Sequence, residues 1–238
     1  MIHWLLQTQT AHPDLGQGVS PPGLLSEEET AVFNKLRILK RRQDWLLGRW
    51  TAKHLIQEMM HQKHGESVPL NAISILAAED GAPLAKLDSQ FDHHGSRFTV
   101  SISHSQGSSF CAVIERPNWP LGADIERIEP RARNFTADFF TEAEQAFIEQ
   151  SRPEMVDALV TTIWSGKEAA LKAIRQGLRV DTRDIYCQVK ADDTLPQEWT
   201  ALHLNWQRQE DKQQLPSLSG WWKVDGQYVL TLAAQDNH

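Results

Sequence analysis

Three carboxylates and a lysine have the types and the spacing of a site for a magnesium ion and a phosphate group. Asp124 and Glu126 stand two residues apart in a strand-like run, and alternate residues of a strand point to the same face. Further along the chain, Glu168 and Lys172 stand one helical turn apart. Mg²⁺ prefers hard oxygen ligands such as carboxylates, and a nearby cation suits a bound phosphate.

Each half of this set also has a simpler interpretation. Asp124 and Glu126 could be alternate strand residues that face solvent, although a cation would relieve the repulsion between them. Glu168 and Lys172 could be an exposed helical ion pair, which stabilises a helix by roughly 0.2–0.5 kcal/mol. Trp164 falls on the same polar face, where an exposed tryptophan is unusual. The residues alone leave both interpretations open.

Histidines offer two further candidates. His104 ends a strand-like run in Ser-His-Ser, but no nucleophile motif accompanies it, so a serine-hydrolase triad is not indicated. Asp92, His93 and His94 form a possible metal cluster in a polar loop without nearby cysteines. A solvated loop is the favoured interpretation of that loop, and zinc binding is the alternative.

Basic residues gather in two segments of a chain whose formal net charge is −7. Such local clusters are candidates for phosphate capture or for solvated surface. The first segment contains Lys35, Arg37, Lys40, Arg41, Arg42, Arg49 and Lys53, and the second contains Arg127, Arg131 and Arg133.

The composition predicts a cytosolic protein that binds neither nucleic acid nor membrane. The chain has 238 residues, 40% of them hydrophobic, and its net negative charge disfavours both partners. Its cysteines, Cys111 and Cys187, suggest no disulfide framework. No apolar run reaches the length of about 18 residues that a membrane span needs, and the start lacks the pattern of a signal peptide.

The elements that position these residues predict an α+β fold in two similar halves, 1–117 and 118–238. The first half begins a helix at Ser26, with the capping box completed by Glu29, and continues with a helix over 43–62. Strands are expected over 72–77, 98–103 and 109–115, the last two joined in a hairpin by a turn at 105–108. Pro117–Pro120 separates the halves.

The second half repeats this plan. A strand over 121–128 precedes a capping box formed by Thr141 and Glu144 and a long helix over 153–176. Strands are then expected at 184–189, 200–206, 217–224 and 228–233, with an Asp-Gly hairpin turn at 225–226. The repetition indicates an internal duplication, with the site where the halves meet.

Two motifs resemble the Sfp-type 4′-phosphopantetheinyl transferases. Their signature is G-x-D-x-E, found here at 122–126, followed by W-x-x-K-E-x-x-x-K, found here at 164–172. Residues 139–144, the Ser-His-Ser at 103–105 and the Gly-Arg at 48–49 also resemble stretches of that family. The resemblance extends over roughly residues 30–190.

This resemblance implies a pseudo-twofold α+β monomer that binds coenzyme A and Mg²⁺, with Mn²⁺ as a possible substitute, between its halves. The N-terminal half would form the coenzyme A side, and the C-terminal half would carry the metal motifs. The implied reaction transfers 4′-phosphopantetheine from coenzyme A to a serine of an acyl or peptidyl carrier protein, releasing adenosine 3′,5′-bisphosphate. Such carriers serve fatty acid, polyketide or nonribosomal peptide synthesis.

The resemblance also assigns roles to residues. Asp124, Glu126 and Glu168 would bind the metal, and Glu168 would also accept the serine proton, directly or through water. Lys172 would act in catalysis by contacting the pyrophosphate. The family's G-K-P lysine is absent, because Asp80–Pro83 reads Asp-Gly-Ala-Pro. The groups expected to contact coenzyme A are Arg41, Arg42, Arg49, His104, Lys167 and Lys172, with Lys86 a further substitute for the missing lysine; for Lys167, carrier contact or a structural role stays open.

An acidic carrier would dock on Arg127, Arg131 and Arg133 with exposed residues among Phe135, Phe139 and Phe140, although ordinary core packing is expected for at least one of these phenylalanines. A catalytically inactive coenzyme A- or nucleotide-binding regulator of the same fold is the alternative function. An ATP-dependent phosphotransferase is less favoured, because no Gly-x-x-x-x-Gly-Lys-Ser/Thr loop is present.

Overall fold

A computed structural model describes residues 1–93, 95, 97–176, 180–189, 194–207 and 215–236. The chain is an α+β protein that divides between Trp119 and Pro120 into two compact units, here called unit 1 (1–119) and unit 2 (120–238). This division lies two residues beyond the boundary expected from the sequence. Each unit is described by itself.

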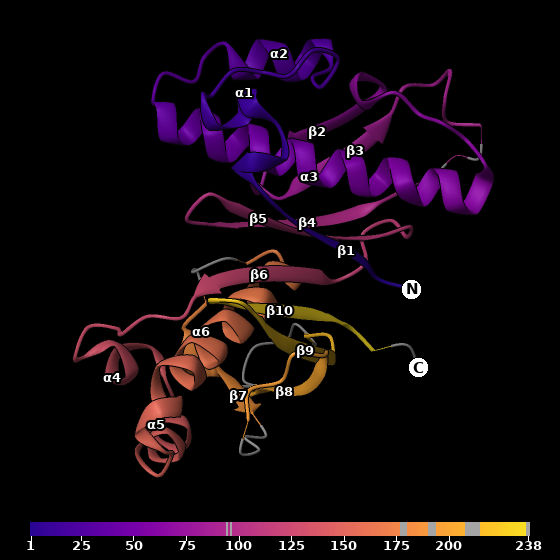
Figure 1. The fold of residues 1–238 in the computed structure, drawn as a ribbon. Helices are drawn as coiled ribbons and strands as arrows, with labels where there is room; N and C mark the ends of the chain where they lie inside the picture. Colours follow the sequence, from indigo (N-terminus) through magenta and orange to yellow (C-terminus); the bar gives the residue numbers. More distant parts are fainter. Residues whose placement is uncertain (94, 96, 177–179, 190–193, 208–214, 237–238) are drawn as a thin grey trace. The chain divides into compact units, whose positions relative to one another are not determined.

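Unit 1 is a sheet with one long helix on it (Figure 1). Its elements in chain order are β1 (His3–Thr8), α1 (Pro13–Gly16), α2 (Glu27–Phe33), α3 (Leu39–His64), β2 (Ile73–Ala77), β3 (Pro83–Leu87), β4 (Thr99–Ser105) and β5 (Ser108–Ile114). The described strands pair antiparallel in the order β1-β5-β4-β3-β2.

The core of unit 1 forms where α3 packs on this sheet. Ile56 and Met60 of α3 are buried against Ile73 and Val113 of the strands. Each such side chain stabilises the fold by about 1.5–3 kcal/mol. The helix ends at Gly65, whose φ of 69° lies in the left-handed region that glycine adopts without strain.

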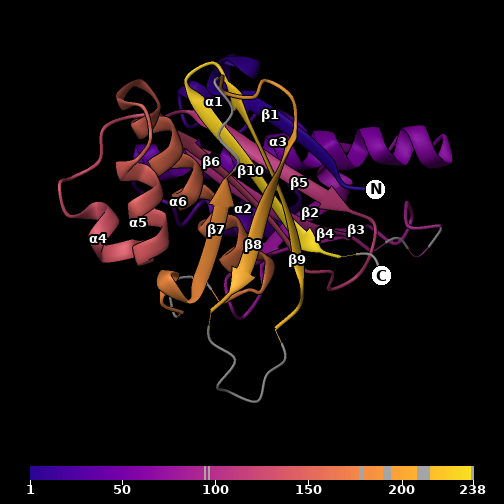
Figure 2. The same ribbon diagram turned by 90° about the horizontal axis from the view of Figure 1, so that it is seen from below.

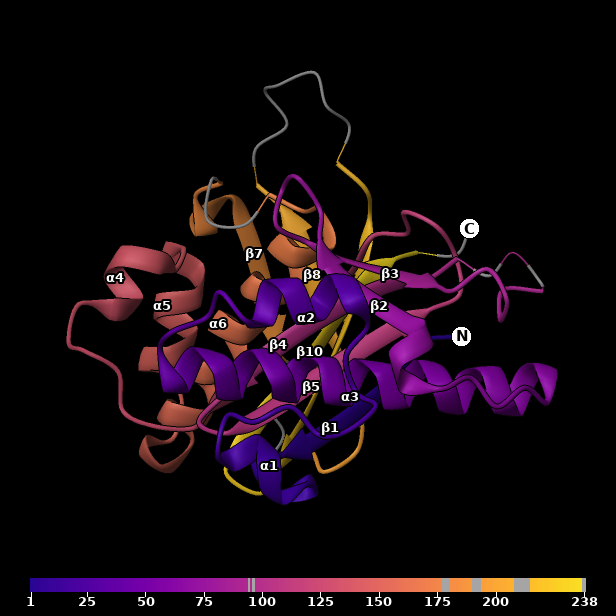
Figure 3. The same ribbon diagram turned by 90° about the horizontal axis from the view of Figure 1, so that it is seen from above.

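A second, smaller cluster joins α1 and α2 to α3, and Figure 3 shows α2 beside α3. Leu15 and Phe33 pack there against Leu46 and Leu47 of α3. Helix α2 begins with the predicted capping box, in which the Ser26 hydroxyl accepts from the Glu29 amide and the Glu29 carboxylate accepts from the Ser26 amide.

Unit 2 places helix α6 along one face of its sheet (Figure 2). Its elements are β6 (Leu121–Arg127), α4 (Phe135–Phe139), α5 (Glu142–Glu149), α6 (Val156–Ala173), β7 (Ile185–Val189), β8 (Thr200–Trp206), β9 (Leu218–Asp225) and β10 (Tyr228–Gln235). The described strands pair antiparallel in the order β6-β10-β9-β8-β7. Leu159 and Ile163 of α6 pack in the core with Val229 and Trp222.

The two units share one strand order. In each, the first strand pairs with the fifth, which is followed by the fourth, third and second. This shared topology supports the internal duplication. The predicted hairpins at 105–108 and 225–226 are confirmed, because Ser105 pairs with Ser108 and Asp225 with Tyr228. Strands β1 and β3 were not expected from the sequence. No helix in the described ranges has an apolar stretch long enough to cross a bilayer.

Candidate functional site

Gly122, the first residue of the carboxylate motif, allows β6 and α6 to approach closely. A Cβ atom built on Gly122 would lie 1.7 Å from the carbonyl oxygen of Ala169 on α6. Only glycine leaves room for this backbone contact. Since side chains alternate along a strand, Asp124 and Glu126 belong to the same face as this contact. The glycine of the motif therefore serves to bring the carboxylate strand against the helix that carries Glu168 and Lys172.

Asp124 lies buried under α6, with only 3% of its surface exposed. Its Oδ1 accepts a hydrogen bond from Lys172 Nζ at 2.7 Å, and its Oδ2 accepts one from Ser165 Oγ at 2.7 Å. The solvent-facing interpretation of Asp124 is therefore wrong. The sequence did not indicate the role of Ser165, although this serine stands inside the second motif.

Glu126 lies nearer the surface and pairs with a different cation. Its Oε2 accepts a hydrogen bond from Arg131 Nη2 at 2.9 Å. Arg131 follows β6 in the segment that leads to α4. Each strand carboxylate thus holds one basic side chain of unit 2.

Glu168 is electrostatically coupled to both strand carboxylates. Burial raises the pKa of Glu168 above its usual value, Asp124 and Glu126 raise it further, and Lys172 opposes the shift. Repulsion of this kind is what a bound cation relieves.

Carboxylates are the ligand type that a hard divalent cation prefers, and Asp124 and Glu126 are both close enough to Glu168 to influence its charge. Their present partners are protein cations, since Lys172 pairs with Asp124 and Arg131 with Glu126. In this conformation, no group of three or more His, Cys, Asp or Glu side chains in the described ranges is arranged to hold a metal ion. Metal binding would therefore require these side chains to exchange partners.

Replacing Glu168 with glutamine is expected to stabilise the protein at pH 7 in EDTA. The ionised Glu168 is disfavoured by burial and by its acidic neighbours, and glutamine removes the charge. A gain of about 1 kcal/mol would raise the melting temperature by roughly 2–4 °C.

Because the folded-state pKa is raised, the parent loses stability relative to the variant as pH rises through that pKa. The difference should vanish in acid, where Glu168 is protonated. Exposed Glu149→Gln on α5 is the control. A lower melting temperature for Glu168→Gln at pH 7 would contradict the electrostatic account.

Lys167 is a buried residue whose ammonium group is bound by other groups of unit 2. Its side chain is fully buried, and its Nζ lies 2.7 Å from Glu144 Oε2. The same Nζ donates to the carbonyl oxygens of Phe139 at 3.2 Å and Thr182 at 2.9 Å. The second oxygen of Glu144 accepts from the amide of Cys187 on β7. The expectation that Lys167 binds coenzyme A is corrected, because its ammonium is occupied inside unit 2.

Unit 1 contains the same arrangement. Buried Lys53 of α3 pairs with Glu29, the capping-box residue of α2, and donates to the carbonyl oxygen of Leu24. The other oxygen of Glu29 accepts from the amide of Ile75 on β2. In both units, a capping-box glutamate therefore joins a short helix, a long helix and the strand that is second in chain order, β2 in unit 1 and β7 in unit 2. These shared ion pairs support the internal duplication independently of the strand order.

Lys167→Met is expected to destabilise the protein by about 3 kcal/mol, because it leaves the buried carboxylate of Glu144 without its counterion. The measurement is the free energy of unfolding in urea. The double variant Glu144→Gln/Lys167→Met removes both charges and should recover part of the loss. Unchanged stability of Lys167→Met would contradict the structural role.

Three residues of the first basic segment, Lys40, Arg41 and Arg49, line an open cavity of ≈370 Å³ in unit 1. Its lining residues are Ile38, Lys40, Arg41, Asp44, Trp45, Arg49 and His104. The guanidinium of Arg49 lies 4.0 Å from the centre of the Trp45 ring and donates to the carbonyl oxygen of Ile75. Burial lowers the pKa of Arg49 to about 10, and Glu29 opposes the shift. Arg41, Arg49 and His104, three of the expected coenzyme A contacts, thus lie around one cavity.

Gly48 of the Gly-Arg segment lies against His104 of the Ser-His-Ser segment. A Cβ on Gly48 would lie 2.6 Å from Nε2 of His104, so glycine lets the histidine ring pack against α3. Arg42 donates to the carbonyl oxygens of Gly18 and Leu36 and is not among the residues that line this cavity. Its expected contact with coenzyme A stays a prediction.

The remaining sequence candidates lie elsewhere. Lys86 is exposed on β3. Asp92 forms an ion pair with Arg97 at 2.9 Å, and His94 lies outside the described residues. Arg133 is exposed beyond β6.

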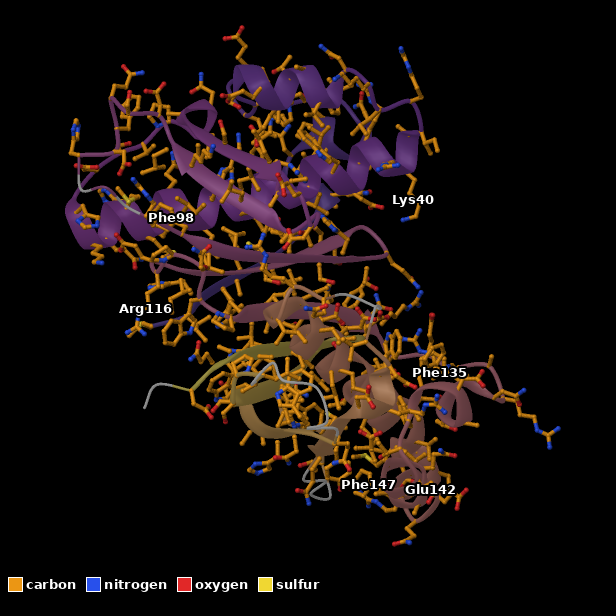
Figure 4. All side chains as sticks on the ribbon, turned by 180° about the vertical axis from the view of Figure 1, so that it is seen from behind. Lys40, Phe98, Arg116, Phe135, Glu142 and Phe147 are labelled. Atoms are coloured by element: carbon orange, nitrogen blue, oxygen red, sulfur yellow. The ribbon has the colours of Figure 1, made fainter. Side chains whose placement is uncertain are left out.

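Trp164 belongs to an aromatic cluster (Phe135, Phe139 and Trp164) and is only partly exposed. Its ring centre lies 5.1 Å from that of Phe135 and 5.0 Å from that of Phe139. Figure 4 marks Phe135 at the start of α4. Phe140 is only 1% exposed, so core packing accounts for this phenylalanine.

Comparison with known proteins connects this geometry to a family. A family model described as the 4′-phosphopantetheinyl transferase superfamily matches residues 120–233, which contain the carboxylate strand and α6. A holo-[acyl-carrier-protein] synthase of Streptococcus agalactiae is 34% identical over 91 residues, which are 38% of this chain and 72% of the synthase.

Longer relatives extend the match into unit 1. A 4′-phosphopantetheinyl transferase of Aneurinibacillus migulanus is 26% identical over 172 residues, which are 72% of this chain and 65% of the relative. One of Bacillus pumilus is 27% identical over 154 residues, which are 65% of this chain and 59% of the relative. The chain thus spans less than two thirds of these two relatives. The match over most of the synthase and over the motif region establishes that the chain belongs to the 4′-phosphopantetheinyl transferase superfamily.

Proposed function

We propose that the protein transfers the 4′-phosphopantetheine group of coenzyme A to a serine hydroxyl of an acyl or peptidyl carrier protein, with release of adenosine 3′,5′-bisphosphate. The observation that carries the proposal is the arrangement of Asp124, Glu126, Glu168 and Lys172 where β6 meets α6. The family supplies the reaction class.

Asp124, Glu126 and Glu168 would hold Mg²⁺, which when bound supplies positive charge to the pyrophosphate in the transition state. Lys172 already presents an ammonium beside Asp124 and would neutralise phosphate charge. Glu168 would accept the serine proton, directly or through a water molecule, and its raised pKa in the metal-free protein suits a proton acceptor.

Arg41, Arg49 and His104 would bind phosphate groups of coenzyme A at the cavity of unit 1. Arg49 is already aligned by Trp45 and by the carbonyl oxygen of Ile75, so little side-chain entropy remains to be lost. Lys40 is held by Asp44 at 2.9 Å on the same cavity.

We further propose that the enzyme works as a cytoplasmic monomer. Both cysteines are unbridged and buried, which suits a reducing compartment. Two units of the same topology are present in one chain. Size-exclusion chromatography with light scattering would test the monomeric state.

Intact-mass measurement tests the reaction. The purified protein is incubated with coenzyme A, Mg²⁺ and a panel of apo carrier proteins. The expected result is a carrier heavier by one phosphopantetheine group, absent when EDTA is added or when the acceptor serine is replaced by alanine. Coenzyme A binding without modification of any carrier would favour the regulatory alternative, and carrier phosphorylation from ATP would favour a different phosphotransferase.

A further inference from the structure

A chain of two buried hydroxyl groups ends at one oxygen of Asp124, while Lys172 binds the other oxygen. Strands β6 and β10 lie side by side against α6 (Figure 1), and Thr231 of β10 is the residue paired with Asp124 of β6. The hydroxyl of Ser165 on α6 donates to Asp124 Oδ2 at 2.7 Å and lies 2.8 Å from the Thr231 hydroxyl oxygen. Both hydroxyl residues are fully buried. Three elements therefore contribute one polar group each to this chain.

The hydrogen bonds of the chain point toward Asp124. An ionised carboxylate only accepts hydrogen bonds, so the single proton of the Ser165 hydroxyl is used at Asp124. The contact between the two hydroxyls must then use the proton of Thr231, whose other acceptor is the carbonyl oxygen of Ser165 at 2.9 Å. Both of these acceptors belong to Ser165, so Thr231 fixes the serine, and the serine fixes the aspartate.

Thr231 is important because a serine inside a helix has a competing acceptor. Hydroxyl side chains in helices commonly donate to the carbonyl oxygen four residues earlier, as Thr162 of α6 and Thr51 of α3 do at 2.8 Å. Ser165 donates to Asp124 instead, and the Thr231 hydroxyl lies beside it. Loss of the Thr231 hydroxyl would allow Ser165 to turn away from Asp124.

We infer that Ser165 and Thr231 are positioning residues that hold Asp124 in the orientation that keeps the Lys172 ammonium in place. With Oδ2 bound by Ser165, Oδ1 faces Lys172, whose Nζ lies 2.7 Å away and also donates to the carbonyl oxygen of Ala123. The lysine side chain is 30% exposed, so the chain connects the interior of unit 2 to a cation that a solute can reach. These contacts are all between protein groups, and their effect on turnover rests on the proposed function.

The hydrogen–nitrogen NMR signal of the Lys172 ammonium group tests this orientation without coenzyme A or metal, and its absence from Lys172→Arg assigns it. Ser165→Ala and Thr231→Val are expected to shift or broaden the signal, because Asp124 is no longer held. Thr231→Ser keeps the hydroxyl and should retain the parental signal. Thr162→Val is the matched control, because it removes a buried hydroxyl whose acceptor lies within α6.

The second measurement is kcat and KM for coenzyme A with an apo carrier protein, on variants that circular dichroism shows to be folded. Ser165→Ala should lower kcat by roughly ten- to a hundredfold, the factor that corresponds to loss of a hydrogen bond to a charged group. Thr231→Val should lower kcat by about three- to tenfold, and Thr231→Ser should recover it. In the double variant, Thr231→Val should add nothing to Ser165→Ala, because the threonine acts through the serine.

The outcomes separate the inference from the proposed function. An unchanged Lys172 signal in Ser165→Ala, or no such signal in the parent, would overturn the inference. Equal effects of Thr231→Ser and Thr231→Val, or a further loss in the double variant, would also overturn it, because packing and not the hydroxyl chain would then be responsible. If the parent modifies no carrier while the Lys172 signal responds as expected, the proposed function fails and the positioning stands. Effects confined to Ser165→Ala, Thr231→Val and their combination would support the inference.

Discussion

Replacing Asp124 with alanine is expected to abolish phosphopantetheine transfer, lowering kcat/KM by about a thousandfold or more. Asp124 is the most buried of the three proposed metal ligands and also holds Lys172 at 2.7 Å. One substitution therefore removes a ligand and releases the lysine proposed to neutralise phosphate. A loss of about 4 kcal/mol in transition-state stabilisation corresponds to this factor.

The measurement is kcat/KM for the carrier, with circular dichroism as the check on folding. Asp124→Asn is the sharper variant, because its amide keeps the shape that Ser165 and Lys172 surround and removes only the charge. Asp225→Ala, at the end of β9, is the control for loss of an aspartate in the same unit. Near-parental turnover by folded Asp124→Asn would refute the metal assignment.

Gly122→Ala is expected to reduce the free energy of unfolding by about 5 kcal/mol or more. The added methyl group would lie 1.7 Å from the carbonyl oxygen of Ala169, and a backbone atom of helix α6 cannot turn aside as a side chain can. Strand β6 would have to separate from α6, which would also part Asp124 from Ser165 and Lys172.

Urea unfolding measures this loss. Gly16→Ala is the control, because a Cβ on Gly16 meets nothing within 4 Å. Soluble Gly122→Ala with parental stability would mean that β6 and α6 are not held at the distance described here.

Local features of the fold were predictable from the sequence. The capping boxes of α2 and α5 depend on residues three apart, and both form as expected. The hairpin turns depend on adjacent residues such as Gln106 and Gly107, whose φ angles of 43° and 79° suit a two-residue turn. Strand β1 escaped prediction because its pairing partner, β5, lies far along the chain. Strand β3 pairs with its chain neighbour β2, but it is only five residues long and begins with a proline, which disfavours a strand in the middle of a sheet.

The candidate site also has features that the sequence determined and features that only the tertiary structure decided. The sequence alone determined the identity and spacing of Asp124, Glu126, Glu168 and Lys172, because motif spacing is a property of the chain. Tertiary structure alone decided that Lys167 is buried against Glu144 while Lys172 reaches Asp124. Five residues on a helix turn through about 500°, so the two lysines must lie on different faces. Which face is buried depends on what packs against it, and neither Glu144 nor Asp124 is a sequence neighbour of α6.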